Sequence, residues 1–291
     1  MGLGVAAVQN VLELWQQGLF ENKKKIIEMG SQELHLKAHD FEEMIKTAGV
    51  TNYEKKNFPN LDNWPEQPRC PSKYLYKMLG IDEYYSFDLN EEHNSISWDF
   101  NLPFEDTSQY SQFDFVTDHC ACGHAFNIAE SYRTIHRLCK PGGLIMVCLP
   151  LWKGNGYFLY DRYFIDGIAA ANNYKILFNS YVIGITEETE AGSDQQFHIP
   201  MKRELLNTID ISKIPWAGIY AVLQKQTEDD FQFPYQDKYL AEKLNIEGFN
   251  HLYSQDPFSY SYIPFSSIET EPGKKLIKEL FKRIRKRLFR I

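Results

Sequence analysis

The sequence predicts an α/β protein whose mostly parallel, doubly wound sheet carries helices on both faces. Apolar runs typical of buried strands alternate along the chain with segments whose apolar residues recur at helical spacing. Glycine- and proline-containing breaks separate these segments, and polar residues directly follow several of the strand-like runs. The chain has 291 residues, 43% hydrophobic and 15% aromatic, so it can bury a large core. We therefore expect a single elaborated domain over residues 1–272.

The expected elements follow from these patterns in chain order. They are a helix over 5–18, a strand over 25–29, a helix over 72–79, strands over 84–87 and 113–117, a helix over 127–139, a strand over 144–149, a helix over 157–171, and strands over 176–183 and 218–223. Four prolines between residues 51 and 71 exclude a regular element there, so we interpret 35–71 as an insertion. Ser72 is the candidate N-cap of the second helix. A second insertion is expected over 185–215.

Polar residues gather at the carboxyl ends of the predicted strands, which is where open α/β sheets bind ligands. Glu28 and Gly30 close the first strand, Asp88 closes the second, and Asp118 with His119 follows a later one. A glycine there allows a sharp turn and a close approach of backbone N–H groups to a ligand. An acid at the end of the second strand can accept hydrogen bonds from both ribose hydroxyls. The pattern therefore predicts a nucleoside-bearing cofactor.

Five segments, taken in order, resemble the motifs of class I S-adenosylmethionine-dependent methyltransferases, especially the group called methyltransferase type 11. They are residues 26–30 (IIEMG), Asp88, residues 98–104 (WDFNLPF), residues 113–124 (FDFVTDHCACGH) and residues 138–143 (LCKPGG). The resemblance implies a seven-stranded, Rossmann-like methyltransferase sheet, S-adenosylmethionine as the cofactor, and methyl transfer as the activity.

The resemblance also implies roles for individual residues. Asp88 would bind the ribose hydroxyls, the loop at Gly30 the methionine end, and Asp99 with Phe100 the adenine. The full set expected at the cofactor is Glu28, Gly30, Ser31, Asp88, Asp99, Phe100 and Asp118.

The chain departs from the family pattern in its first loop. Gly30 is followed by Ser-Gln-Glu-Leu instead of further glycines, and 58 residues separate it from Asp88. Two alternatives therefore stay open: a non-catalytic protein that keeps the fold as a scaffold, and an oxidoreductase that binds a dinucleotide. The missing G-x-G-x-x-G sequence disfavours the oxidoreductase.

His119 and His124 are the candidate catalytic residues, because they lie in the loop expected to face the transferred methyl group. A histidine with a near-neutral pKa could take the proton of an acceptor hydroxyl. The alternative is that both are packing or surface residues. Five aromatic residues between 152 and 163 either pack a helix on the sheet or line an acceptor cleft.

Charge and cysteine content bear on partners and location. The net charge is −8, and an acidic surface disfavours binding to nucleic acid. Five scattered cysteines fit a reducing cytoplasm, and Cys120 with Cys122 is a poor zinc signal, so no metal is expected. No apolar run reaches the length needed to span a bilayer.

The C-terminal segment 273–291 differs from the rest of the chain. Residues 274–290 hold nine Lys and Arg and one Glu, and apolar residues recur there at helical spacing. Such an amphipathic helix can lie on an anionic membrane surface, or else dock on the acidic body of the protein. We therefore expect a cytoplasmic enzyme, peripheral on the membrane, that O-methylates a sugar, another small metabolite or a lipid-linked sugar in envelope polysaccharide synthesis.

Overall fold

The computed structural model describes residues 2–184, 196–201 and 214–235. The expected C-terminal helix over 273–291 lies outside these residues, as does most of the expected insertion 185–215. In the described part of the chain, no helix combines the length and the apolar character needed to cross a membrane.

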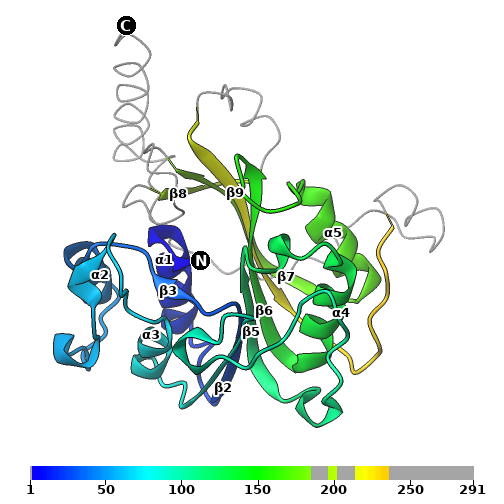
Figure 1. Ribbon diagram of the computed structural model, residues 1–291, viewed down its shortest axis with the longest axis horizontal. Helices are drawn as coiled ribbons and strands as arrows, with labels where there is room; N and C mark the ends of the chain where they lie inside the picture. Colours follow the sequence, from blue (N-terminus) through cyan, green and yellow to red (C-terminus); the bar gives the residue numbers. More distant parts are fainter. Residues whose placement is uncertain (1, 185–195, 202–213, 236–291) are drawn as a thin grey trace, which may run out of the picture.

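A seven-stranded sheet forms the centre of the molecule, as the sequence predicted (Figure 1). In spatial order the strands are β4 (Glu83–Phe87), β2 (Lys25–Met29), β5 (Phe113–His119), β6 (Cys139–Trp152), β9 (Trp216–Gln224), β7 (Lys175–Gly184) and β8 (Gln196–Ile199). β4, β2, β5 and β6 are parallel, whereas β9 runs antiparallel to both β6 and β7, and β8 runs antiparallel to β7. The sheet is therefore mostly parallel, with β8 and β9 reversed.

Helices cover both faces of this sheet (Figure 1). On one side lie α1 (Val5–Gln16), α2 (Ala38–Thr47) and α3 (Lys73–Met78), and on the other lie α4 (Ile128–Leu138) and α5 (Arg162–Ala171). We call these sides the α1 face and the α4 face. The predicted doubly wound arrangement is confirmed.

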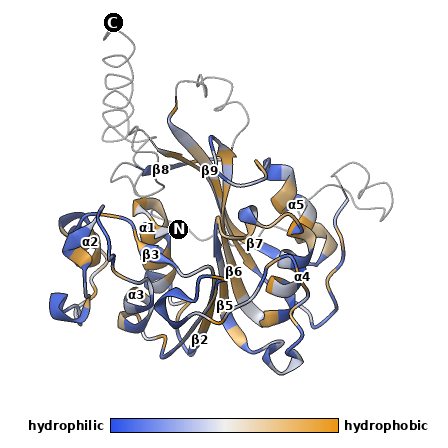
Figure 2. Ribbon diagram, in the orientation of Figure 1, coloured by the Kyte–Doolittle hydropathy of each residue, from blue (hydrophilic) through white to orange (hydrophobic). Residues whose placement is uncertain are grey.

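The central strands are buried on both faces, so their side chains alternate between two apolar clusters. In β6, Leu144 and Met146 pack in the cluster on the α1 face, whereas Ile145 and Val147 pack in the cluster on the α4 face. Figure 2 shows hydrophobic residues concentrated in these strands, while α2 is largely hydrophilic. The same alternation decides which face receives each polar residue near a strand end.

Several predicted elements have different ends in the structure. β5 runs on through His119, because Asp118 and His119 pair with Val147 and Cys148 of β6. The strand expected over 144–149 is longer, because β6 begins at Cys139 and ends at Trp152. α5 begins at Arg162 instead of 157, because the Asp161 side chain accepts a hydrogen bond from the N–H of Tyr163 and caps the helix there.

The N-terminal segment lies against the chain that follows β2. β1 (Gly2–Leu3) pairs with β3 (Glu33–Leu34), and neither strand was expected from the sequence. Gly2 packs so closely on His35 that a Cβ atom at this position would lie 2.2 Å from the imidazole Cδ2. The start of the chain is thereby fixed beside the carboxyl ends of the parallel strands. The expected insertion over 35–71 contains α2, followed by irregular chain with two short 3₁₀ turns.

Candidate active site

The loop after β2 is attached to the end of β4. Gly30 has a φ of +89°, which favours glycine, and its N–H donates to the carbonyl of Phe87 at 2.7 Å. The N–H and the hydroxyl of Ser31 both donate to Oδ2 of Asp88, at 2.9 and 3.0 Å. The structure therefore brings Gly30, Ser31 and Asp88 together, and their expected contacts with the cofactor stay a prediction.

Glu28 lies apart from this loop, buried on the α1 face. Its carboxylate accepts hydrogen bonds from the hydroxyls of Ser72 and Tyr84, and from Thr117 at 3.3 Å. Ser72 is the N-cap residue of α3, as expected from the sequence, but its hydroxyl donates to Glu28 and makes no side-chain cap to the helix. Burial raises the pKa of Glu28 to about 7, although the hydroxyl donors oppose this shift. Its expected contact with the cofactor stays a prediction.

Asp118 points to the α4 face, away from its neighbour His119. Its Oδ1 accepts the N–H groups of Ala121 and Cys122 at 2.8 and 3.0 Å, and its Oδ2 accepts the hydroxyl of Tyr132 at 3.3 Å. Burial raises the pKa of Asp118 to about 6. These bonds show that the carboxylate holds the loop after β5, and the cofactor contact expected for Asp118 stays a prediction.

Asp99 and Phe100 support the start of α4. Oδ1 of Asp99 accepts the backbone and side-chain N–H groups of Asn101 at 2.9 and 2.8 Å. The carbonyl of Phe100 accepts the Ser131 hydroxyl at 3.0 Å, and its ring packs on Trp98 with centroids 5.2 Å apart. The adenine contact expected for Asp99 and Phe100 therefore also stays a prediction.

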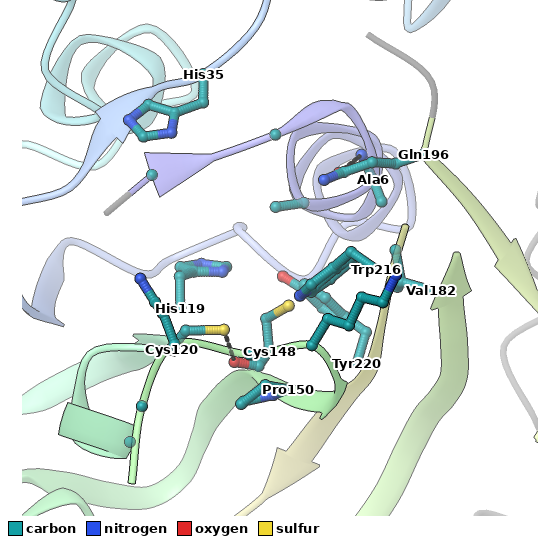
Figure 3. A pocket seen from close by; sticks show the side chains of 18 of the residues that line it. Ala6, His35, His119, Cys120, Cys148, Pro150, Val182, Gln196, Trp216 and Tyr220 are labelled. Atoms are coloured by element: carbon teal, nitrogen blue, oxygen red, sulfur yellow. Dashed lines mark hydrogen bonds between the residues drawn. The ribbon is translucent and has the colours of Figure 1, made fainter. Parts of the chain in front are cut away.

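A cavity of about 230 Å³ lies between the N-terminal segment and the ends of the central strands (Figure 3). Gly2, Gly4 and Ala6 form one wall, and the segment after β5 with the last part of β6 forms the opposite wall. Both predicted catalytic histidines, His119 and His124, line this cavity. The cavity and the Gly30–Asp88 loop lie along the same carboxyl edge of the sheet.

His119 is the most unusual residue of the cavity wall. It is only 3% exposed, and within the described residues neither ring nitrogen has a hydrogen-bond partner. Burial lowers its pKa to about 4, so the imidazole is neutral at physiological pH. A buried polar group without a partner costs roughly 1 to 3 kcal/mol, which a ligand in the cavity could recover. His124 is more exposed, and partial burial also lowers its pKa.

Two thiols lie beside His119. Cys120 has a φ of +66°, and its thiol donates to the carbonyl of Cys148 at 2.9 Å (Figure 3). The interaction with Cys148, together with burial, raises the pKa of Cys120 well above its usual range. A thiol held in this neutral state is a poor nucleophile. In the described residues no group of His, Cys, Asp and Glu has the arrangement of a metal site.

Sequence reasoning missed several residues of the cavity. Arg69 reaches it from the proline-rich loop, and Lys153 with Gly154, Asn155 and Gly156 reaches it from the loop after β6. The two glycines at 154 and 156, after the strand predicted over 144–149, were the available signal in the sequence. The interpretation of this segment rested on its aromatic residues instead.

The order of the strands decides the fold. Class I methyltransferases have the order 3-2-1-4-5-7-6. In this chain β4, β2, β5, β6, β9 and β7 take positions 2, 1, 4, 5, 7 and 6, with position 7 reversed. The chain has the fold of the class I methyltransferases. It differs at the sheet edges, because position 3 is reduced to a parallel bridge between Phe87 and Ile96, and β8 is added at the other edge.

Comparison with known proteins gives remote similarities. No protein-family model matches the sequence, nor does any curated protein sequence. An S-adenosylmethionine-dependent methyltransferase from Archaeoglobus fulgidus is 12% identical, with 75% of this chain and 94% of that one covered and a TM-score of 0.37. Another from Thermotoga maritima is 11% identical, with 74% and 91% covered and a TM-score of 0.32. The StiE O-MT is 13% identical, with 87% and 84% covered and a TM-score of 0.36.

The end of β4 fits the nucleoside part of the methyltransferase cofactor. Among the described residues, Oδ1 of Asp88 receives one long hydrogen bond, from the N–H of Asn90 at 3.3 Å, so it keeps capacity for a ribose hydroxyl. Leu89 and Ile96 beside it are 65% and 46% exposed, and such apolar surface suits a flat ring. Asp88 with the Gly30–Ser31 loop is therefore the part of this chain that could hold S-adenosylmethionine.

Proposed function

We propose that this protein transfers a methyl group from S-adenosylmethionine to an oxygen atom of a small acceptor bound in the cavity. The observation that carries the proposal is His119, a buried neutral imidazole on the cavity wall whose two nitrogens have no hydrogen-bond partner among the described residues. The class I methyltransferase fold supplies the context, since His119 lies at the end of β5, next to the strand that carries the Gly30 loop.

The chain's own residues would divide the work. Asp88 binds the ribose and the Gly30–Ser31 loop orients the cofactor, which supplies an activated methyl group. His119 accepts the acceptor's hydroxyl proton while the new O–C bond forms and the cofactor's bond to the methyl group breaks. Its low pKa keeps the imidazole unprotonated at neutral pH, and it also makes His119 a weaker base than an exposed histidine. Because this site is buried, water competes poorly as an acceptor.

The acceptor is expected to be a sugar or another small metabolite. Phe126 and Tyr157 expose 73% and 68% of their surfaces, and their rings lie 5.7 Å apart. The loop that carries Tyr157 also contributes Gly156 to the cavity, so these rings are placed to pack on a sugar ring. A lipid-linked sugar remains our proposal for an acceptor in envelope synthesis, with the C-terminal segment as the contact to an anionic membrane.

One contact favours a second candidate function, a scaffold without catalysis. The two hydrogen bonds from Ser31 already satisfy Oδ2 of Asp88, so a ribose would have to use Oδ1 or displace Ser31. A protein that has lost its cofactor could retain such an internally satisfied acid.

Transfer of a labelled methyl group separates the two functions. The full-length protein is incubated with S-adenosylmethionine carrying a tritiated methyl group and a panel of hydroxylated sugars and sugar phosphates. We expect label in at least one acceptor with the wild type and strongly reduced label with His119→Ala. Absence of transfer to every acceptor, together with absence of binding of S-adenosylhomocysteine, would contradict the enzyme and favour the scaffold.

A further inference from the structure

The charges on the cavity wall are unlike those of the whole chain. The protein has a net charge of −8, yet the charged side chains lining the cavity are Arg69 and Lys153, accompanied by three histidines. Within the described residues, no Asp or Glu lines it. Because the cavity is small, about 230 Å³, any molecule inside lies close to this positive wall.

The two cations differ in their surroundings. Arg69 lies 3.8 Å from Glu33, donates to the carbonyl of Pro65 and stacks over Trp64. Its charge is therefore partly balanced within the protein. Lys153 has an exposed side chain in the loop after β6, at the mouth of the cavity.

The backbone next to Lys153 adds donors. Lys153 has a φ of +54°, and Gly154, Asn155 and Gly156 follow it along the cavity wall. In the described part of the chain, the backbone N–H groups of these three residues donate no hydrogen bond. Successive free N–H groups in a turn beside a cation form a common arrangement for binding an anion.

Packing fixes this loop close to the candidate catalytic segment. The N–H of Tyr157 donates to the carbonyl of Gly123 at 2.8 Å, and a Cβ atom on Gly156 would lie 2.5 Å from the same oxygen. A Cβ atom on Gly154 would lie 2.3 Å from Cβ of Pro150. Glycine at position 156 therefore allows the loop to lie against the segment after β5, and glycine at position 154 allows it to lie against β6.

We propose that the acceptor carries an anionic group, a phosphate or a carboxylate, which Lys153 and the N–H groups of Gly154, Asn155 and Gly156 bind. This inference rests on the proposed function, since it names the class of acceptor for the same cavity. The anion is held at the loop after β6, and the hydroxyl to be methylated points inward to His119. The exposed aromatic rings of Phe126 and Tyr157 cover the part of the acceptor that lies between its anionic group and the hydroxyl to be methylated.

Nuclear magnetic resonance of the full-length protein, labelled with ¹⁵N-glycine, tests the anion site with inorganic phosphate as the probe. We expect saturable shifts of the Gly154 and Gly156 amide signals, and at least fivefold weaker binding in Lys153→Gln. The matched control Lys175→Gln, an exposed lysine at the start of β7, should bind phosphate like the wild type. Absence of saturable shifts with both phosphate and acetate, or equal affinity in Lys153→Gln and the wild type for the anion that binds, would overturn the proposal.

Two further arms identify the chemistry and separate the proposals. Acetate replaces phosphate in one titration and neutral glycerol in another; saturable shifts with either anion support the site, whereas equal shifts with glycerol contradict it. Calorimetry with S-adenosylhomocysteine is run on the same samples. Cofactor binding without anion shifts rejects the anionic acceptor alone, and anion shifts without cofactor binding reject methyl transfer while the anion site stands.

Discussion

Glu28 and His119 are two buried ionisable residues on the same face of the sheet, and they differ in their hydrogen bonding. Glu28 is surrounded by hydroxyl donors from Ser72, Tyr84 and Thr117, whereas His119, two residues beyond Thr117, has no partner among the described residues. Folded proteins leave few buried polar groups unpaired, so the hydrogen bonds of Glu28 give it a structural role, whereas His119 keeps both nitrogens for a ligand. The cavity beside His119 provides the place for that ligand.

The largest expected effect follows from removal of His119. His119→Ala should lower turnover by roughly 10²- to 10⁴-fold, the range typical of a general base, and leave the affinity for S-adenosylhomocysteine within about twofold. His39→Ala, with a side chain 84% exposed on α2, is the control and should leave turnover unchanged. Unchanged turnover in a folded His119→Ala protein would show that the unpartnered imidazole is not used in catalysis.

Glu28 should instead affect stability, in a direction set by its raised pKa. The native carboxyl binds its proton until about pH 7, whereas the unfolded one releases it near 4.5, so the native state is disfavoured as the pH rises between these values. Relative to wild type, Glu28→Gln should gain roughly 3 kcal/mol in the free energy of unfolding between pH 4.5 and pH 8. Urea unfolding measures this difference, and parallel pH curves for the two proteins would contradict the raised pKa.

The pH dependence of turnover should be the smallest effect. Because the pKa of His119 is about 4, the imidazole is already unprotonated at pH 5.5. Turnover under saturating substrates should therefore change less than about twofold between pH 6 and pH 8. A fall in turnover with an apparent pKa near 6.5 would instead indicate a base in an ordinary environment.

The central fold could be predicted from the sequence because each strand has a pattern of its own in the local sequence. The apolar runs of β2, β5 and β6 and the polar residues after them are visible without knowledge of their partners. Side chains alternate between the two faces of a strand, so a strand predicted through His119 would have placed Asp118 and His119 on opposite faces of the sheet. The strand was expected to end at Thr117, however. The hydrogen bonds to Asp118 from Ala121 and Cys122 depend on that extension.

Contacts between distant segments could not be predicted in this way. Ser72 has the position of an N-cap, yet it bonds Glu28, 44 residues earlier, because the fold places α3 over β2. Tertiary packing also determines three other features: the pairing of β1 with β3, the position of Arg69 in the cavity wall and the closeness of Gly156 to Gly123. The sequence therefore singled out His119 and His124 as candidate catalytic residues, but neither the cavity that they line nor its charge could be predicted.

The most direct test of the central claim is the binding of S-adenosylhomocysteine to the full-length protein, measured by calorimetry with wild type, Asp88→Ala and His119→Ala. We expect one site per chain in the wild type. In Asp88→Ala the lost hydrogen bonds to a charged acceptor should weaken binding by roughly 1.5 to 3 kcal/mol, and in His119→Ala affinity should stay near that of the wild type. An affinity unchanged by Asp88→Ala, or no binding by the wild type, would contradict a methyltransferase whose cofactor lies at β4 and whose acceptor lies beside His119.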